Sequence, residues 1–345
     1  MRHEPLLSVL WVGLALAAPL AWTTSAHAAP SPVGLAKGWR VAGTGLHLGG
    51  YGTQDLTKET GMPWRLTTED LSLFSSWNAT SRVRVFSELS LEDMLIAQPG
   101  TGVRTNSATL AFERLYVDYR TSERLTARVG RFLTPVGHWN LIHADPLVWT
   151  TSRPIVTDYP FPTYATGAMI YGTLGPFPRQ IGYSLYGGSG DDTPGSPGKN
   201  PYNTLYGGRL SYAFGNNKVG FSYAHFAQEV PLVEQNDLVG VDWRWSRGGY
   251  ALSSEAIYRF SSLGPAEDER GAFLQGVAPL SARLFAVARY EYFWQGSAFP
   301  AVHLWLAGLA LRVTRTSVLK AEYAWARHNT VGAETGFLSS FGILF

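Results

Sequence analysis

Apolar and polar residues alternate one by one along many short segments of this chain. Between Tyr250 and Phe260 every second position is apolar or small, and Glu255 and Arg259 fall between them. Successive side chains of a β-strand point to opposite faces, so this period of two predicts a strand with one apolar and one polar face. The same pattern recurs in four further segments: 83–91, 239–245, 283–294 and 318–328.

The whole chain divides into sixteen predicted strands. Short turns such as 215–217, 246–249 and 313–316 alternate with longer polar loops. Transmembrane barrels show this asymmetry, with tight turns on the periplasmic side, and an even strand count places both chain ends there. We therefore predict an all-β fold, a transmembrane antiparallel β-barrel of about 16 strands. The predicted strands are 38–51, 65–76, 81–92, 107–120, 123–133, 163–174, 179–189, 202–214, 218–229, 237–246, 249–260, 271–279, 282–294, 301–313, 316–327 and 336–345.

The composition supports a barrel and excludes several other classes of protein. Aromatic residues make up 13% of the chain, glycine numbers 37, and cysteine is absent, which excludes disulfides and cysteine zinc sites. The formal net charge of +2, from scattered basic residues, gives no argument for nucleic acid as a partner. After residue 28 no apolar run is long enough for a transmembrane helix. A soluble β-sandwich also alternates, but here aromatic residues gather at strand ends on the apolar face, which is typical of membrane interfaces.

The first 28 residues have the organisation of a secretory signal peptide. Arg2 precedes the apolar stretch LLSVLWVGLALAAPLAW, and Ala26-His27-Ala28 has the small-x-small form of a cleavage site. We expect residues 1–28 to be removed and residues 29–345 to form the barrel. The alternative is a membrane anchor, which Pro19 within the apolar stretch disfavours.

The chain ends on a hydrophobic strand, GFLSSFGILF, with Phe341, Ile343 and Phe345 at alternate positions. An exposed edge of this kind would promote aggregation, so we expect the last strand to pair with the first and to close the sheet. This terminal pattern resembles that of the Gram-negative outer-membrane porins, of the general or the phosphate-selective type. The barrel resemblance covers the whole of residues 29–345 with low specificity.

A second, shorter resemblance lies at the end of the fifth predicted strand. Gly130-Arg131-Phe132, followed by Pro135, is similar to a stretch found where strand five leaves the barrel in phosphate-selective porins. The chain lacks the lysine-rich loop that a phosphate-selective member would carry.

The resemblance implies a location, partners and a function. It implies the outer membrane of a Gram-negative bacterium, contact with outer-membrane lipid, a barrel assembly machinery that reads Phe345, and a homotrimer as one arrangement. The implied function is a water-filled channel for passive diffusion of small hydrophilic solutes. The alternative is a non-conducting barrel that acts as a scaffold or binds a partner protein.

The longest connection, residues 134–162, follows the fifth predicted strand. It exceeds the usual loop length and is rich in apolar residues for a segment in water. It is the third external loop, and in sixteen-stranded porins the third external loop folds into the lumen and narrows it. The alternative is an external loop that packs on its neighbours. The constriction residues implied for this chain are His138, Trp139, His143, Asp145 and Asp158.

Charged residues at inward-facing positions form the candidate pore lining, because rings of charge set the selectivity of a pore. Arg82, Arg84, Arg114 and Arg128 would form one basic wall opposite the long loop and give a mild anion preference. Alternatively, they pair with carboxylates across strands and only line the wall. The basic candidates are Arg82, Arg84, Arg114, Arg128, Arg244, Arg259, Arg283, Arg289 and Lys320, and the acidic candidates are Glu88, Asp118, Asp242, Glu255, Glu291 and Glu322.

Glu113 does not fit the alternation of its strand. It falls on the lipid-facing side in mid-strand, where a charge is unfavourable. Either a bulge shifts the register there, or that wall faces another subunit.

The sequence carries no signature of an enzyme, a metal site or a cofactor. No serine lies in a nucleophile-elbow motif, and His225 and His303 are isolated in the sequence. His138 and His143 are five residues apart in a loop and lack the spacing of a metal-binding pair on a regular element. We therefore expect no catalytic residue, no metal and no cofactor.

Overall fold

The protein is described here by a computed structural model of residues 38–105, 108–142, 144–158, 160–176, 179–189, 202–228, 233–264 and 267–345. The predicted signal peptide, residues 1–28, lies outside these residues. No helix within them is long and apolar enough to cross a membrane. The strands are β1 Trp39–Val41, β2 Leu46–Glu59, β3 Arg65–Asn78, β4 Val83–Gln98, β5 Gly102–Arg104, β6 Thr109–Ser122, β7 Leu125–Leu133, β8 Tyr164–Leu174, β9 Ile181–Ser189, β10 Thr204–Phe214, β11 Asn217–Gln228, β12 Glu234–Arg247, β13 Tyr250–Leu263, β14 Glu269–Pro279, β15 Leu284–Gln295, β16 Val302–Arg312, β17 Ser317–Arg327 and β18 Gly336–Leu344, and the helical segments are the 3-10 helix η2 Asp145–Leu147 and the α-helix α2 Ile155–Asp158.

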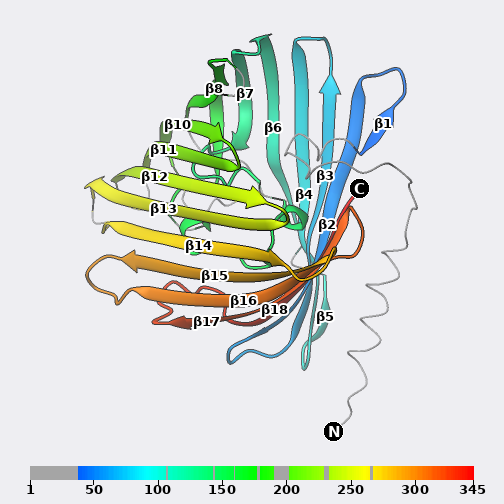
Figure 1. Ribbon diagram of the computed structural model, residues 1–345, viewed down its shortest axis with the longest axis vertical. Coiled ribbons are helices and arrows are strands. Elements are labelled where there is room, and N and C mark those ends of the chain that lie inside the picture. The colour runs from blue at the N-terminus through cyan, green and yellow to red at the C-terminus, as the bar shows by residue number, and fades with distance from the viewer. Residues whose placement is uncertain are drawn as a thin grey trace.

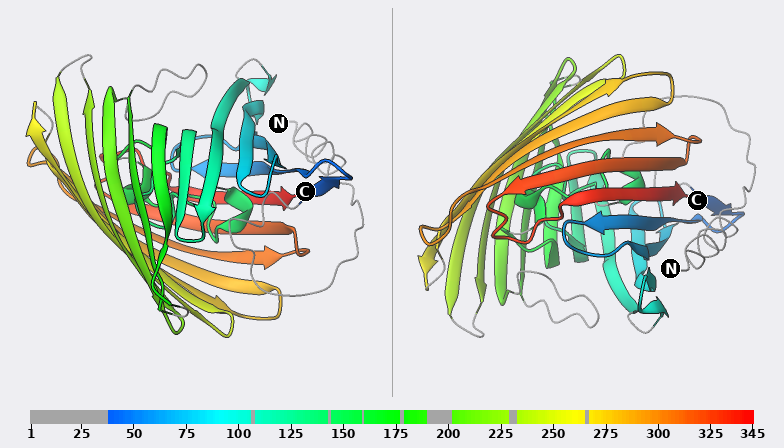
Figure 2. Two further views of the ribbon diagram at one scale, coloured as in Figure 1. Left: turned by 90° about the horizontal axis from the view of Figure 1, so that it is seen from above. Right: turned by 90° about the horizontal axis from the view of Figure 1, so that it is seen from below.

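Sixteen of these strands form one closed antiparallel ring (Figure 1, Figure 2). Each of these sixteen strands pairs with the next along the chain, with β4 pairing directly with β6, and β18 pairs with β2 to complete the ring. At the junction the backbone of Phe345 exchanges hydrogen bonds of 2.9 and 3.0 Å with that of Gly50. The three-residue strands β1 and β5 only extend the pairing of β2 and β4. The predicted all-β barrel of sixteen strands is confirmed.

The two faces of the ring differ in chemistry, as the period of two predicts. On β17 the large side chains of Leu319, Tyr323 and Trp325 are exposed on the outside, whereas Lys320 and Glu322 are buried on the inside. The same division holds for most strands, so an apolar and aromatic outer wall surrounds a polar inner wall. Exposed outward side chains include Leu73, Trp77, Leu110, Phe112, Val117, Val129, Leu185, Leu210, Phe221, Val241, Leu274, Tyr290 and Leu309.

The first strand of the ring lies further along the chain than predicted. The sequence pattern places it at 38–51, whereas β2 begins at Leu46 and ends at Glu59. Gly43 and Gly45 both have positive φ, of 76° and 70°, and form a turn that separates the short β1 from β2. Such a conformation costs glycine little and other residues more, so the strand cannot run straight through these positions.

Glu113 lies at a register shift in the pairing of β4 with β6. Glu88 is opposite Arg114 and Leu89 is opposite Phe112, so Glu113 is the additional residue of a bulge. Its side chain is 4% exposed. A bulge re-aims side chains, which explains how a carboxylate at a nominally lipid-facing position is buried. The sequence allowed two explanations, a bulge in the register or a wall that faces another subunit, and the structure shows the bulge.

Gly130, in the Gly-Arg-Phe stretch, occupies a position that tolerates no side chain. Its φ is 131°, and a Cβ atom would lie 2.7 Å from the Tyr116 Cα and closer still to the Leu115 carbonyl oxygen, both on β6. The glycine therefore allows β6 and β7 to approach each other just before the long loop.

We expect the substitution Gly130→Ala to disrupt the pairing of β6 with β7. The added methyl group meets backbone atoms in a conformation unsuited to alanine, so the cost should be about 1 kcal/mol or more. The yield of heat-modifiable barrel after refolding in detergent measures the effect. Gly276→Ala is the matched control, because its Cβ would meet only the Leu252 side chain at 3.5 Å. Equal yields for the two variants would contradict this account of Gly130.

Candidate functional site

The loop between β7 and β8 is held by charged side chains that belong to the inner wall of the barrel. It spans residues 134–163 and contains η2 and α2. Its hydrogen-bond partners lie on β10, β11, β13, β15, β17 and β18, which together form one side of the ring. Residues far apart in the chain are thereby brought to one site.

Lys320 is the most completely buried cation among these partners. Its side chain is 0% exposed, and its ammonium group donates to the Asp145 carboxylate at 2.9 Å and to the backbone carbonyls of Asp145 and Thr150 at 3.1 and 3.0 Å. A buried ammonium is stable only if its donors are satisfied. Because all three acceptors come from the loop, the loop supplies the partners that Lys320 requires.

Three wall carboxylates bind backbone N–H groups of the loop. Glu255 on β13 accepts from His138 at 2.8 Å and from Trp139 at 2.6 Å. Glu291 on β15 accepts from Ile155 at 2.7 Å. Charge-assisted hydrogen bonds of this kind are stronger than neutral ones, so each carboxylate is a strong anchor point.

The third carboxylate, Glu322 on β17, binds the middle of the loop. It accepts from the backbone N–H groups of Thr151 and Ser152 at 2.9 and 2.7 Å, and from the Ser152 hydroxyl at 2.6 Å. The polar wall of β17 therefore holds the loop through Glu322 and Lys320 together.

Two buried arginines complete the attachment. Arg289 pairs with Glu291 at 2.7 Å and also donates to the Thr150 hydroxyl and to the Ser152 carbonyl at 2.8 and 3.0 Å. Arg209 on β10 pairs with Asp242 at 2.7 Å and donates to the Gly137 carbonyl at 3.1 Å. Each guanidinium thus joins a wall carboxylate to the loop backbone.

Apolar side chains of the loop pack against apolar residues of the inner wall. The Trp139 ring meets Phe273 edge-on at 6.0 Å, and the Trp149 ring lies 4.9 Å from Phe285. Phe285 falls on the side of β15 that carries Arg289 and Glu291, which breaks the alternation of that strand. Packing against Trp149 is the physical reason.

The two ends of the loop are tied to each other by side chains of the loop itself. Asn140 donates to the carbonyls of Thr134 and Thr163 at 2.8 and 3.1 Å, and Arg153 donates to the Asn140 side-chain oxygen at 2.8 Å. Arg153 also lies 4.0 Å from Asp158, and burial lowers its pKa against the attraction of that carboxylate.

His138 is neutral in this environment. Burial and the nearby charges of Arg244, Lys218 and Arg209 lower its pKa to about 3. Its Nε2 lies 2.9 Å from Nη1 of Arg244 and accepts that hydrogen bond, which requires an unprotonated nitrogen. Of the predicted constriction residues, His138, Trp139 and Asp145 contact residues of the wall, and Asp158 lies near Arg153 within the loop. His143 lies outside the described residues.

The opposite side of the ring carries a ladder of aromatic rings interleaved with paired arginines. Rings of Tyr51, Phe74, Phe86 and Tyr116, on β2, β3, β4 and β6, follow one another with centroids 5.1 to 6.0 Å apart. The Arg128 guanidinium lies 3.6 Å from the Tyr116 ring. Aromatic and cation–π contacts of this kind hold the arginines in fixed positions.

Two of the four arginines of the predicted basic wall are neutralised across strands. Arg114 pairs with Glu88, and Arg128 makes two hydrogen bonds of 2.7 and 3.0 Å with Asp118. The alternative interpretation, in which these residues pair with carboxylates, therefore describes Arg114 and Arg128.

The remaining predicted lining residues divide into paired and unpaired groups. Arg259 pairs with Glu269 at 3.0 Å. Arg82 and Arg283 lie in the turns before β4 and β15 rather than on strands. In the part of the chain that the structure describes, the predicted residues Arg82, Arg84, Arg244 and Arg283 have no carboxylate oxygen within 4.0 Å. The same holds for Arg120 and Lys218, which were not among the predicted lining residues.

Several residues of the site were not anticipated from the sequence. Arg209 lies on the inward face of β10, whereas Tyr206 and Leu210 lie on the outward face. The alternation of side chains along this strand could therefore have revealed Arg209. Arg153 and Asn140 lie in irregular backbone, where no periodicity applies. Only the folded loop brings them together.

The outward histidines lie among polar and aromatic side chains near the strand ends opposite the tight turns. His225 contacts Asp237 at 3.0 Å and stacks on Tyr206, and His303 contacts the Tyr290 hydroxyl at 2.8 Å. Within the described residues, no group of three or more His, Asp or Glu side chains is arranged to hold a metal ion.

We expect Lys320→Met to loosen the loop. The change removes a buried cation and leaves loop acceptors without a donor, at a cost of about 3 kcal/mol or more. Because the chain has no cysteine, a nitroxide on Leu141→Cys reports loop mobility by electron paramagnetic resonance, and its spectrum should narrow. Lys58→Met, on β2 outside the loop contacts, is the matched control. An unchanged spectrum in Lys320→Met would show that Lys320 does not anchor the loop.

Acid should loosen the same loop through His138. Its pKa is about 3 in the docked loop and about 6.5 when unperturbed, so the undocked state binds the additional proton between these values. The docked state therefore loses stability as pH falls below about 6.5. The same spin label should gain mobility from pH 7 to pH 4, and His138→Asn should reduce this change. An equal response in both proteins would assign the effect to other groups.

Comparisons with known proteins agree with the geometry of the barrel. No protein-family model matches the sequence, and no curated protein matches it. Among solved structures, OmpF of Salmonella typhi in complex with daunomycin has a TM-score of 0.64 at 11% identity, over 88% of this chain and 98% of that one. An anion-selective porin from Comamonas acidovorans has a TM-score of 0.57 at 15% identity, over 87% and 98%.

The trimer form of OmpT, an outer membrane protein of Vibrio cholerae, has a TM-score of 0.59 at 11% identity, over 87% of this chain and 97% of that one. At such low identities these similarities concern the arrangement of the backbone. The chain has the barrel fold of the outer-membrane porins.

Proposed function

We propose that this protein is a porin of the Gram-negative outer membrane, a water-filled channel for passive diffusion of small hydrophilic solutes. The observation that carries the proposal is the division of the closed ring into an apolar, aromatic outer wall and a charged inner wall. Such a wall presents apolar side chains to lipid on its outer side and charged side chains to water on its inner side. The similarity to solved porins supports it.

The loop of residues 134–163 is the proposed constriction of this channel. Its bonds to Glu255, Glu291 and Glu322 support a position across the inside of the barrel. The three carboxylates are occupied by loop N–H groups, so they contribute less negative field to the pathway than their number suggests.

A mild anion preference is part of the proposal. The charges of the paired residues on the wall cancel. In contrast, no carboxylate partner within the described part of the chain is available to Arg84, Arg120, Lys218 and Arg244. Uncompensated positive charge raises the local concentration of anions.

Two partners follow from the same proposal. Phe345 ends the strand that closes the ring and is half exposed, which suits recognition by a barrel assembly machinery. A homotrimer is the proposed assembly, supported by the similarity to the trimer form of OmpT.

One observation favours the alternative, a non-conducting barrel that acts as a scaffold or binds a partner. Buried apolar side chains from the loop and from both sides of the ring, including Val136, Ile155, Phe273 and Phe74, form one cluster. Packing of this kind fills part of the barrel interior. Conductance measurements distinguish a diffusion channel from a non-conducting barrel.

We expect purified protein to give stepwise conductance in planar lipid bilayers. In a salt gradient the reversal potential should show a small excess of anion over cation permeability. The double variant Lys218→Gln, Arg244→Gln should shift that potential toward zero, because it removes two uncompensated charges beside the loop. Lys58→Gln is the control. Silent bilayers would refute the channel, and an unchanged potential in the double variant would refute this origin of selectivity.

A further inference from the structure

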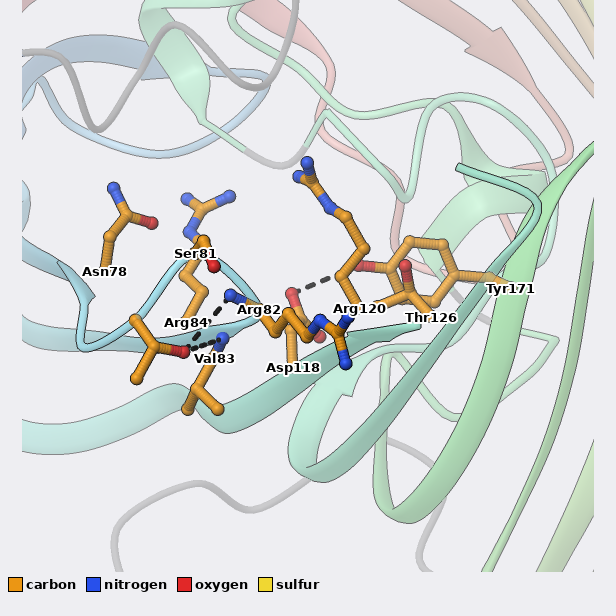
Figure 3. A pocket seen from close by; sticks show the side chains of 10 residues that line it. Asn78, Ser81, Arg82, Val83, Arg84, Asp118, Arg120, Thr126 and Tyr171 are labelled. Atoms are coloured by element: carbon orange, nitrogen blue, oxygen red, sulfur yellow. Dashed lines mark hydrogen bonds between the residues drawn. The ribbon is translucent and has the colours of Figure 1, made fainter. Parts of the chain in front are cut away.

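A small pocket lies on the inner wall at the end of the barrel where β3 turns into β4 and β6 turns into β7. Its volume is about 70 Å³. Figure 3 shows that the Arg84 and Arg120 side chains point in roughly the same direction, whereas the Arg82 side chain points another way, toward the base of Arg120. The pocket is lined by Asn78, Thr80, Ser81, Arg82, Val83, Arg84, Asp118, Arg120, Thr126 and Tyr171.

The charge of this pocket is strongly unbalanced. Three arginines, Arg82, Arg84 and Arg120, are among its lining residues, and Asp118 is the one acidic residue among them. Asp118 already accepts two hydrogen bonds from Arg128 and one of 3.1 Å from the Tyr171 hydroxyl. In the described part of the chain none of the three arginines has a carboxylate oxygen within 4.0 Å, so the lining of the pocket carries a net positive charge.

Arg84 and the turn that carries Arg82 are held in place before any ligand arrives. The Arg84 Nε donates to the Ser76 hydroxyl at 2.9 Å, and its guanidinium lies 5.8 Å from the Phe86 ring. The Thr80 hydroxyl accepts from the backbone N–H groups of Arg82 and Val83 at 3.1 and 2.9 Å, which fixes the turn. Such preorganisation reduces the entropy cost of binding.

The pocket opens toward the lumen and not toward lipid. Arg84 alternates with outward-facing residues and lies on the same face of β4 as Phe86 and Glu88, which are buried inside the ring. On β6, Asp118 and Arg120 lie on the same face as Tyr116, which is buried inside the ring. A lipid headgroup on the outer wall cannot reach this face, so the ligand comes from solution inside the channel.

We propose that this pocket binds the oxyanion head of a small solute, a carboxylate or a phosphate, at the periplasmic mouth. Guanidinium groups bind both anions through paired N–H donors. A volume of about 70 Å³ is several times the roughly 10–15 Å³ that one water requires, so it admits a small head group while the rest of the solute stays in the lumen. The site rests on the proposed channel function and names the chemical class of its solute.

Calorimetry on the purified barrel in detergent tests the site without reference to conduction. Inorganic phosphate and acetate are titrated separately in dilute chloride, which distinguishes the two head groups. We expect saturable binding of at least one of them. Arg84→Gln and Arg120→Gln should each weaken it about tenfold, because each removes one charge-assisted contact.

Arg247→Gln is the matched control, since Arg247 is exposed at the same end of the barrel and does not line the pocket. It should bind as the parent does. Heat modifiability in gels shows that each variant folds, and Arg120, which is exposed, is the variant least expected to disturb folding.

Absence of saturable binding, or equal affinity in Arg84→Gln, Arg120→Gln and the parent, overturns the site. Bilayer recordings on the same samples separate this result from failure of the channel. A conducting barrel without oxyanion binding leaves the channel proposal standing, and a silent barrel that binds phosphate retains the site but loses the transport role.

Discussion

Every other feature of the structure depends on closure of the sheet. In hydrocarbon no water is present to pair with backbone groups, and each unpaired N–H or C=O costs several kcal/mol. The pairing of β18 with β2 removes the last two free edges of the ring. Once the ring is closed, every strand has an inside and an outside, and the alternation of the sequence acquires its physical meaning. An apolar outer wall and a charged inner wall are two consequences of the same constraint.

Closure creates a second requirement on the inner wall. Lys320, Arg289 and Glu322 are almost completely buried, and a buried charge is stable only when it is paired or fully hydrogen-bonded. The loop of residues 134–163 provides those partners through its backbone, and in return its own N–H and C=O groups are satisfied. The loop and the charged side of the wall are therefore stable together, and neither would be stable alone in this form.

The wall on the other side of the ring solves the same problem without the loop. Arg114 and Arg128 pair with Glu88 and Asp118 on adjacent strands and lie against aromatic rings. The charges that remain uncompensated are concentrated toward the tight turns, at Arg82, Arg84 and Arg120. The uncompensated positive charge of this wall therefore lies at the mouth of the barrel, and the charges in the middle of the wall nearly cancel.

The sequence by itself determined the number of strands, most of their bounds, and which residues of β13, β15 and β17 face inward, because a period of two is a local property of the backbone. It also identified the loop after Leu133 as unusual. Only the tertiary structure decided where β2 begins, how the bulge at Glu113 turns a carboxylate inward, and which charges pair. These outcomes depend on contacts between residues far apart in the chain, such as Lys320 with Asp145 or Arg209 with Gly137, and no local pattern encodes such contacts.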